Sequence, residues 1–203
     1  WDLYDDCKHL MPEVGPIPYD QQDAHSKRIL DANDRDNFTI SDQDIRRSRR
    51  AYFANISYLD DKIGEVMAAL ESTRQEATIL FVSDHGDMLG ERGLWFKMSF
   101  FEGSARVPLM IAGPGLKAGR IDTPVSTLDV TPTLADLAGI SLDEVLPWTD
   151  GESLIGLANG QERLSPVAME YAAEGSYAPL VGLRYGKWKY TRCKWKFTWN
   201  ILT

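Results

Sequence analysis

Apolar and polar residues alternate along the chain in a pattern that predicts helices separated by short strands. Between positions 45 and 70 the apolar residues recur at steps of three and four, which predicts one long helix with a buried apolar stripe. The stripe consists of Ile45, Tyr52, Phe53, Ile56, Leu59, Ile63, Val66, Met67 and Leu70. Ser41 and Asp44 have the spacing of a capping box, so we expect the helix to begin there and to end near Ser72.

Two apolar runs, at 79–82 and 107–112, are predicted strands. A helix followed by a fully apolar strand is typical of an α/β fold with a parallel or mixed sheet covered by helices. A second helix is expected to lead from residue 125 to Gly139. It carries Pro132 in its first turn, where the missing N–H costs nothing. We expect Leu134, Leu137 and Ala138 to face inward from this helix.

The two ends of the chain differ from its middle. Residues 1–40 are polar and contain three prolines, which predicts an extended surface segment. After residue 160 the pattern predicts short strands at 167–171, 180–185 and 187–193, hence a small antiparallel subsheet. We therefore expect two domains, residues 1–160 and residues 161–203, the second of them truncated or divergent after residue 193.

Composition narrows the function classes. The 203 residues are 43% hydrophobic and 26% charged, as in an ordinary soluble globular protein. The net charge of -8 argues against a nucleic-acid partner, and the cationic cluster at 46–50 is interpreted as the solvated start of a helix. No apolar run approaches the roughly 20 residues of a membrane span, so we expect no membrane association and a cytoplasmic location. Cys7 and Cys193 have no zinc-site spacing and are expected to be two thiols.

Candidate chemistry follows the first predicted strand. Asp84 and His85 stand where the apolar run ends, and Gly86 can turn the chain away. A carboxylate suits Ca²⁺ or Mg²⁺, and an adjacent imidazole makes Mn²⁺ a candidate, so the pair is a predicted metal site. The structural alternative is a turn with a capping aspartate.

Two cations lie further along the same segment. Lys97 stands between aromatic residues at 95–96 and 100–101 and is a candidate to bind an anionic group. The alternative for Lys97 is a solvated loop lysine. Glu102 and Arg106 are four residues apart, which favours an ordinary ion pair on a helix surface.

Four segments of the chain, in order, resemble type I sulfatases of the alkaline-phosphatase-like superfamily, and choline sulfatases most of all. They are Tyr52-x7-Asp60-x2-Ile63-Gly64; Ser83-Asp84-His85-Gly86 with Lys97 and Val107-Pro108-Leu109; Ser126-x2-Asp129-x2-Pro132-Thr133-Leu134 with Leu137-Ala138-Gly139; and Asp150-Gly151-x-Ser153-Leu154 with Arg184-x2-Lys187-x-Lys189-Tyr190. A single match of this kind would be weak, whereas four in sequence are specific.

This resemblance implies an alkaline-phosphatase-like mixed sheet covered by helices, with residues 1–160 as the C-terminal part of the catalytic domain. It implies hydrolysis of a small sulfate ester, choline sulfate, to choline and sulfate, by an enzyme that is a homo-oligomer when complete. Asp84 and His85 would bind one divalent metal ion, Ca²⁺ first and Mn²⁺ or Mg²⁺ next. Lys97 would bind the sulfate as a catalytic residue. Glu174, close to Glu170, Tyr171 and Tyr177, would bind the ammonium group of choline.

The departures from the sulfatase pattern are equally specific. Sulfatases of this type make a formylglycine nucleophile from C/S-x-P-x-R, and neither Cys7, Cys193 nor any serine here fits that motif. The early Asp-Asp metal pair is missing as well, since Asp60-Asp61 falls inside a predicted helix. We therefore expect a fragment that is inactive alone. Two alternatives stay open: a phosphonate or phosphate ester hydrolase of the same superfamily, and an inactive truncated remnant.

Overall fold

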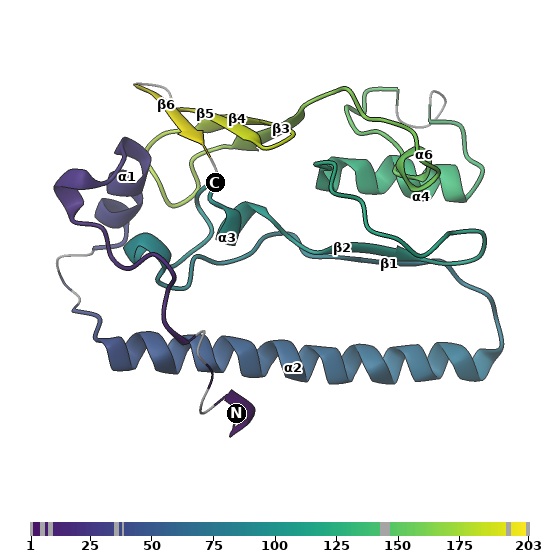
Figure 1. Cartoon of the computed structure of the whole chain (residues 1–203), viewed down its shortest axis with the longest axis horizontal. Helices are drawn as coiled ribbons and strands as arrows, with labels where there is room; N and C mark the ends of the chain where they lie inside the picture. Colours follow the sequence, from purple (N-terminus) through teal and green to yellow (C-terminus); the bar gives the residue numbers. More distant parts are fainter. Residues whose placement is uncertain are drawn as a thin grey trace. The chain divides into compact units, whose positions relative to one another are not determined.

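A computed structural model describes residues 2–4, 7, 10–34, 37, 39–142 and 147–193, together with the backbone of 196–201. Their contacts divide the chain into two compact units (Figure 1). The helical unit comprises Trp1–Ala77, His85–Val107 and Ala173–Tyr177, and the sheet unit comprises Thr78–Asp84, Pro108–Ala172 and Ala178–Thr203. Each unit therefore contains segments that are far apart in the sequence.

The long helix α2 spans Asp42–Thr73 and confirms the predicted bounds within three residues. Its capping box is present, because the Ser41 hydroxyl accepts from the Asp44 N–H at 3.2 Å and the Asp44 carboxylate accepts from the Ser41 N–H at 3.0 Å. At the other end Arg74 adopts a left-handed conformation with φ 56°, which stops the helix.

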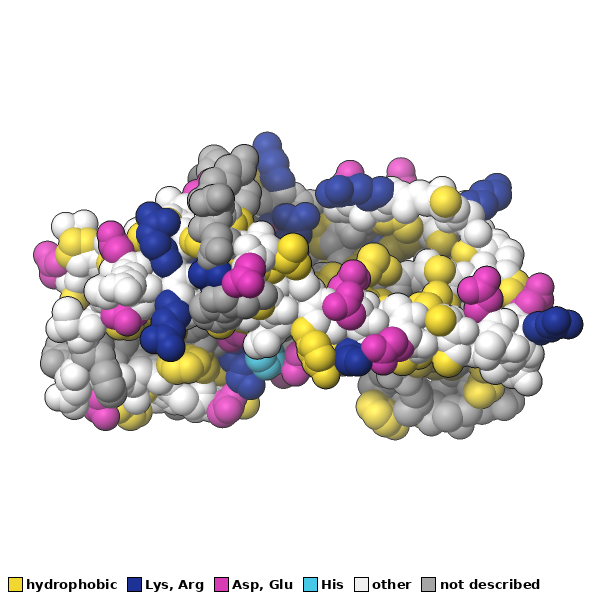
Figure 2. All heavy atoms as spheres, turned by 90° about the horizontal axis from the view of Figure 1, so that it is seen from below, with side chains coloured by type: hydrophobic (Ala, Val, Ile, Leu, Met, Phe, Trp, Pro, Cys, Tyr) yellow, Lys and Arg dark blue, Asp and Glu magenta, His cyan; other side chains and the backbone are white. Residues whose placement is uncertain are grey.

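The predicted burial of the α2 stripe is wrong for most of its length. Ile45 is buried, but Ile56 and Leu59 are each 51% exposed and Val66 is 68% exposed. Figure 2 shows apolar side chains intermingled with acidic ones on the face that it presents. Hydrophobic periodicity indicates which side of a helix can be buried, whereas actual burial requires a partner. Within the described part of the helical unit, residues that pack against α2 contact its first half. For example, Tyr4 packs on Phe53 with ring centroids 5.6 Å apart.

The N-terminal segment is not extended as predicted. It contains the 3-10 turns η1 (Asp2–Tyr4) and η3 (Tyr19–Gln21) and the helix α1 (Ala24–Ala32). Asp23 caps α1 by accepting the N–H groups of His25 and Ser26 at 2.9 and 3.0 Å. The apolar core of this unit consists of Leu10, Ile29, Ile45, Met88, Leu94 and Met98. The N-terminal residues thus supply part of that core.

In the sheet unit, β1 (Ile79–Val82) and β2 (Leu109–Ala112) form a two-stranded antiparallel sheet. Its register runs from Ile79 opposite Ala112 to Val82 opposite Leu109. Both predicted strands are confirmed, although the second begins two residues later than the apolar run. The first strand therefore ends at Val82, two residues before Asp84.

The helical part of the sheet unit consists of η6 (Thr127–Asp129), α4 (Val130–Leu137) and α6 (Ile155–Ala158). Pro132 lies in the first turn of α4, as predicted. The expected inner face is wrong, because Leu134 is 49% exposed while Pro132 and Thr133 are buried. Thr133 faces inward because its hydroxyl donates to the Asp129 carbonyl at 2.6 Å and accepts from the Leu154 N–H at 2.9 Å.

The C-terminal antiparallel subsheet is confirmed. Its strands β3 (Val167–Tyr171), β4 (Leu180–Tyr185), β5 (Trp188–Cys193) and β6 (Lys196–Ile201) pair in sequence order. Gly186 turns the chain between β4 and β5 with φ 52°. The sequence did not predict β6, which extends the sheet past residue 193. The domain boundary at residue 160 stays a prediction.

No helix in the described ranges is long and apolar enough to cross a membrane. Cys7 and Cys193 are thiols and not a disulfide, as predicted.

Candidate functional site

Asp84 and His85 follow β1 after Ser83, and the chain passes from the sheet unit to the helical unit between them. Asp84 is exposed and His85 is half-buried. The next residue must be glycine, because a Cβ on Gly86 would lie 2.1 Å from the carbonyl oxygen of Gly103. The Gly86 N–H donates to the Ser104 carbonyl at 2.8 Å, so this close approach fixes the start of the loop that carries Lys97.

The ring of His85 has the form that a metal ligand needs. Its Nδ1 lies 2.9 Å from the carbonyl oxygen of Gly86. Because a carbonyl only accepts, Nδ1 carries a hydrogen, and in a neutral ring this makes Nε2 the nitrogen that can bind a metal. A backbone carbonyl commonly orients metal-binding histidines in this way. Asp84 and His85 thus fit a divalent cation, but the described part of the chain holds no group of three or more candidate ligands.

The loop between His85 and Lys97 is held by polar contacts with α2 and with the N-terminal segment. It includes the 3-10 turn η5 (Glu91–Gly93). Arg49 of α2 donates to the Leu89 carbonyl at 3.0 Å and lies 3.4 Å from the Glu91 carboxylate. Arg49 is only 9% exposed, so the interpretation of the 46–50 cluster as fully solvated is wrong for this residue. Glu91 in turn accepts the N–H groups of Glu13 and Val14, both at 2.9 Å.

The structure brings Lys97 and Glu174 together within the helical unit. The Lys97 Nζ lies 3.9 Å from the Glu174 Oε2, and the two side chains are 39% and 77% exposed. Such an exposed ion pair contributes about 0–1 kcal/mol to stability, so it is not there to hold the fold together. The contact places a cation and a carboxylate next to each other.

The backbone beside Lys97 is fixed more firmly than its side chain. Ser104, on the short helix α3 (Glu102–Ala105), directs its hydroxyl at the Lys97 carbonyl and at the Ser99 carbonyl, the latter at 3.0 Å. Met98 is buried, and its side chain packs against Gly175. A Cβ added to Gly175 would lie 3.4 Å from the Met98 Cε. The loop that carries Lys97 therefore packs against the segment that carries Glu174.

The other acidic and aromatic candidates lie in two places. Glu170 and Tyr171 are on β3 in the sheet unit. Glu174 and Tyr177 belong to the segment Ala173–Tyr177 of the helical unit, and Tyr177 is 74% exposed. Glu170 thus lies on a strand and Glu174 does not, and the assignment of Glu174 to the ammonium group of choline stays a prediction.

Glu102 and Arg106 form the expected surface ion pair, with the Arg106 Nη1 4.0 Å from the Glu102 Oε2. The structural interpretation of this pair is confirmed.

Sequence reasoning missed two polar contacts near the site. Burial raises the pKa of Tyr52, and the carboxylate of Asp87, which is hydrogen-bonded to it, raises that pKa further. His25 of α1 is buried and lies with its Nε2 2.5 Å from the carbonyl oxygen of Met98. Tyr52 belongs to the apolar stripe of the long helix, so its sequence position indicated a core residue and no contact with Asp87. No local pattern around His25 indicated its contact with Met98, which is distant in sequence.

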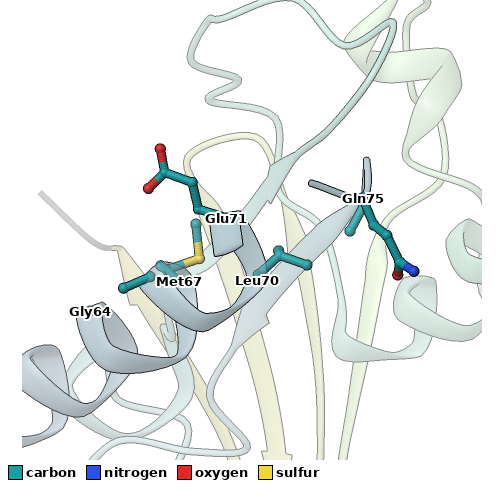
Figure 3. Close-up of a pocket in the computed structure, with 7 residues that line it drawn as sticks. Gly64, Met67, Leu70, Glu71 and Gln75 are labelled. Carbon is teal, nitrogen blue, oxygen red and sulfur yellow. The ribbon is translucent and has the colours of Figure 1, made fainter. Parts of the chain in front are cut away.

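A hollow of about 500 Å³ lies at the C-terminal end of α2, where Gly64, Met67, Leu70, Glu71 and Gln75 line it (Figure 3). Its lining contains none of the predicted site residues. We therefore do not assign the candidate chemistry to it.

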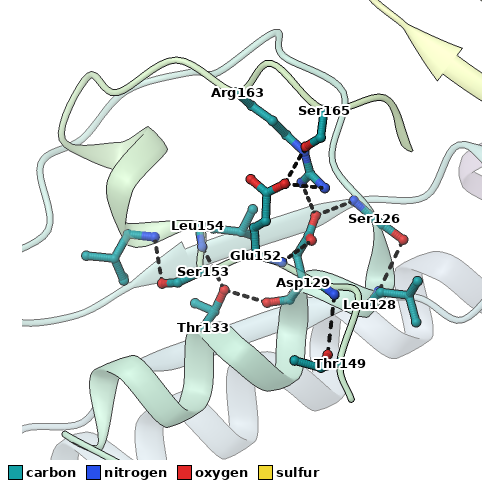
Figure 4. Close-up of polar contacts among 12 residues, drawn as sticks. Ser126, Leu128, Asp129, Thr133, Thr149, Glu152, Ser153, Leu154, Arg163 and Ser165 are labelled. Carbon is teal, nitrogen blue, oxygen red and sulfur yellow. Dashed lines mark hydrogen bonds and ion pairs between the residues drawn. The ribbon is translucent and has the colours of Figure 1, made fainter. Parts of the chain in front are cut away.

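In the sheet unit a second polar cluster surrounds Asp129, which is fully buried (Figure 4). Its carboxylate accepts from the N–H groups of Ser126 and Glu152 at 2.7 and 2.8 Å and from Arg163 at 2.5 Å. These partners all belong to the sheet unit and match the buried charge, so removing one of them should destabilise the fold.

Known proteins resemble this chain in sequence and in fold. Residues 9–140 match the Sulfatase family model. The choline-sulfatase of Rhizobium meliloti (strain 1021) is 68% identical over 195 residues, which cover 95% of this chain and 38% of that relative. The chain therefore spans less than half the length of this relative.

Two solved structures show the same fold. A 2-O GAG sulfatase superposes with a TM-score of 0.72 at 24% identity, over 91% of this chain and 44% of that one. A phosphonate monoester hydrolase from Silicibacter pomeroyi gives a TM-score of 0.73 at 24% identity, over 90% of this chain and 42% of that one. The expected α/β fold, with its likeness to sulfatases, is thereby confirmed. The family-model match and the high identity to a choline-sulfatase together show that the chain belongs to the sulfatase family.

Proposed function

We propose that this chain supplies the sulfate-binding loop and part of the metal site of a sulfuric ester hydrolase that cleaves choline sulfate to choline and sulfate. The identity of 68% to a choline-sulfatase supports the substrate. The single structural observation that carries the proposal is the 3.9 Å approach of Lys97 to Glu174.

Choline sulfate is a short zwitterion. A site that binds it needs a cation for the sulfate and a carboxylate for the ammonium group, placed close together. Lys97 and Glu174 offer this pair from two different segments. Lys97 would bind the sulfate group, and Glu174 would bind the quaternary ammonium. Tyr177, in the same segment as Glu174, can add cation–π attraction of about 0.5–2 kcal/mol.

Asp84 and His85 would hold the divalent cation, with Ca²⁺ preferred for the hard carboxylate oxygen and Mn²⁺ or Mg²⁺ as alternatives. When bound, such a cation supplies positive charge to a sulfate oxygen. The contact of the His85 Nδ1 with the Gly86 carbonyl supports this, because in a neutral ring it would leave Nε2 as the ligand atom. Two ligands are too few for a complete site, so the remaining ones must come from other residues of a complete enzyme.

Lys97 would act on the ester directly. Its ammonium group would donate a hydrogen bond to the sulfate and offset the negative charge that builds on the leaving oxygen. A charge-assisted bond of this kind contributes roughly 1.5–3 kcal/mol.

The formylglycine nucleophile does not fit the residues present, since the sequence holds no C/S-x-P-x-R motif. We therefore derive no step through it and propose that the chain by itself hydrolyses no sulfate ester. In a complete enzyme we propose a homo-oligomer. The thiols of Cys7 and Cys193 suit the reducing cytoplasm, which we propose as its location.

A chimera tests the function, with this chain replacing the corresponding segment of the Rhizobium meliloti choline-sulfatase. We expect it to release sulfate from choline sulfate, with Lys97→Ala lowering kcat about a hundredfold or more. Lys117→Ala, at an exposed lysine, is the matched control and should leave kcat unchanged. A chimera that folds and binds metal but releases no sulfate would refute the proposal.

The phosphonate monoester hydrolase with a TM-score of 0.73 favours a second candidate function. The same chimera separates the two, because a phosphonate hydrolase would cleave phenyl phosphonate monoesters faster than any sulfate ester. An inactive remnant would turn over neither substrate.

A further inference from the structure

We infer that His25 is a positioning residue for Lys97, acting through the backbone carbonyl of Met98. The catalytic importance of this contact rests on the proposed function of Lys97. The contact itself is a property of the fold and can be tested separately.

The first step concerns the state of the His25 ring. Its Nε2 lies 2.5 Å from the Met98 carbonyl oxygen, and because that oxygen only accepts, Nε2 must donate its hydrogen. Burial lowers the pKa of His25, which agrees with a neutral ring buried at 7% exposure. Asp23 fixes the first turn of α1 by accepting the His25 N–H, so the ring is presented from a firm backbone.

The second step concerns the loop that receives this bond. Met98 follows Lys97 directly, and two side-chain donors reach three successive carbonyls in this stretch. His25 donates to Met98, while the single hydroxyl hydrogen of Ser104 is shared between the carbonyls of Lys97 and Ser99. The loop is therefore held by α1 through the Met98 carbonyl and by one shared donor of α3 at the carbonyls on either side.

The third step connects the loop to Glu174. The buried side chain of Met98 packs beside Gly175, the neighbour of Glu174. Gly175 has φ +64°, so this approach occurs at a turn. The contact from His25 thus fixes Met98. The backbone of Met98 continues from Lys97, and its side chain packs against the segment that carries Glu174. Losing the hydrogen bond from His25 should therefore make both Lys97 and Glu174 more mobile.

The fold-level test uses the whole 203-residue chain. His25→Gln keeps an N–H donor at the reach of Nε2, and His25→Met has a similar length without a donor. We expect His25→Met to speed amide hydrogen exchange in residues 97–101 about tenfold, and His25→Gln to stay within about threefold of the wild-type chain. Ile29→Ala is the control, because it removes a buried apolar side chain from the same face of α1 and leaves the hydrogen bond from His25 to Met98 in place.

The inference is overturned if His25→Met leaves exchange at 97–101 unchanged, or if Ile29→Ala speeds it equally at matched overall stability. Should His25→Met fail to fold, His25→Asn takes its place, since its shorter amide cannot reach the Met98 carbonyl. Equal exchange in the Asn and Gln variants would then overturn the inference.

The catalytic readout uses the chimera with choline sulfate. We expect kcat to fall about tenfold in His25→Met and to recover in His25→Gln, with Ile29→Ala near the unmodified value. A chimera without any sulfatase activity would refute the proposed function while the exchange result still decides the contact. Equal kcat in the Met and Gln variants of an active chimera would overturn the positioning role.

Discussion

Arg163 and Asp129 form a buried ion pair, with the Arg163 Nη1 2.5 Å from the Asp129 Oδ2 and side-chain exposures of 5% and 0% (Figure 4). The two residues come from distant parts of the sheet unit. The carboxylate also accepts two backbone N–H groups, so its lone pairs are used and its charge is matched. Such an ion pair is tolerated in the protein interior because each charged group has the opposite charge and hydrogen-bond partners next to it.

Asp129→Ala should lower the free energy of unfolding by about 3–5 kcal/mol, because it leaves a buried guanidinium without its carboxylate. Urea unfolding of the whole chain measures this. The control is Asp122→Ala, which removes an exposed pair with Arg120 at 2.9 Å and should cost less than about 1 kcal/mol. Equal effects of the two substitutions would contradict a stabilising role for the buried pair.

Gly86→Ala should prevent the normal loop conformation, since the added Cβ would lie 2.1 Å from the Gly103 carbonyl oxygen. We expect a large loss of thermal stability. Gly64→Ala, in the middle of α2 with nothing within 4 Å of its Cβ, should instead stabilise the chain by about 0.4–1 kcal/mol. Thermal unfolding of both variants checks the contrast, and similar shifts in Tm would count against the close approach of Gly86 to Gly103.

The pH dependence of stability should include a contribution from His25. Burial lowers its pKa in the folded state, so the unfolded chain binds the proton more tightly. The stabilisation is therefore fully present above the unfolded pKa of about 6.5 and is lost as pH falls through the lower folded pKa. The test is urea unfolding of wild-type and His25→Gln chains from about pH 7.5 to about pH 5, a range that brackets the unfolded pKa. The wild-type advantage should shrink with falling pH, and a constant difference would exclude this linkage.

The capping box at the start of α2 should be visible in the titration of Asp44. Its pKa lies below the ordinary value, chiefly because the Ser41 hydroxyl donates to the carboxylate at 2.6 Å, and next because the Ser41 N–H does. Ser41→Ala removes the first bond and keeps the second, so the pKa of Asp44 should rise part of the way to its ordinary value. Carboxyl carbon NMR measures it, with Asp42 as an internal comparison. An unchanged pKa in Ser41→Ala would contradict the cause given.

Glu174→Gln in the chimera tests the choice of substrate. Losing one charge-assisted contact should reduce kcat/KM for choline sulfate by about ten- to a hundredfold, or roughly 1.5–3 kcal/mol. The rate on 4-nitrophenyl sulfate, which has no ammonium group, should change little. Equal losses on both substrates would show that Glu174 supports the fold or the metal site instead.

The sequence by itself determined the local elements and the family. Helical periodicity and the Ser41 capping box located α2, and the apolar runs located β1, β2 and the first three strands of the subsheet. These features depend on neighbours within a few residues, so they can be recognised without a fold. The motifs around Asp84, His85 and Lys97 likewise identified a sulfatase, because the order of residue types along the chain is itself the signal.

Only the tertiary structure decided which distant residues meet. It brought Lys97 to Glu174, turned His25 toward the Met98 carbonyl and buried Arg163 against Asp129. It also showed that Leu134 faces outward and that much of the α2 stripe is exposed. A periodic pattern states which face of an element could be buried, but burial and pairing depend on what the rest of the chain places opposite that face.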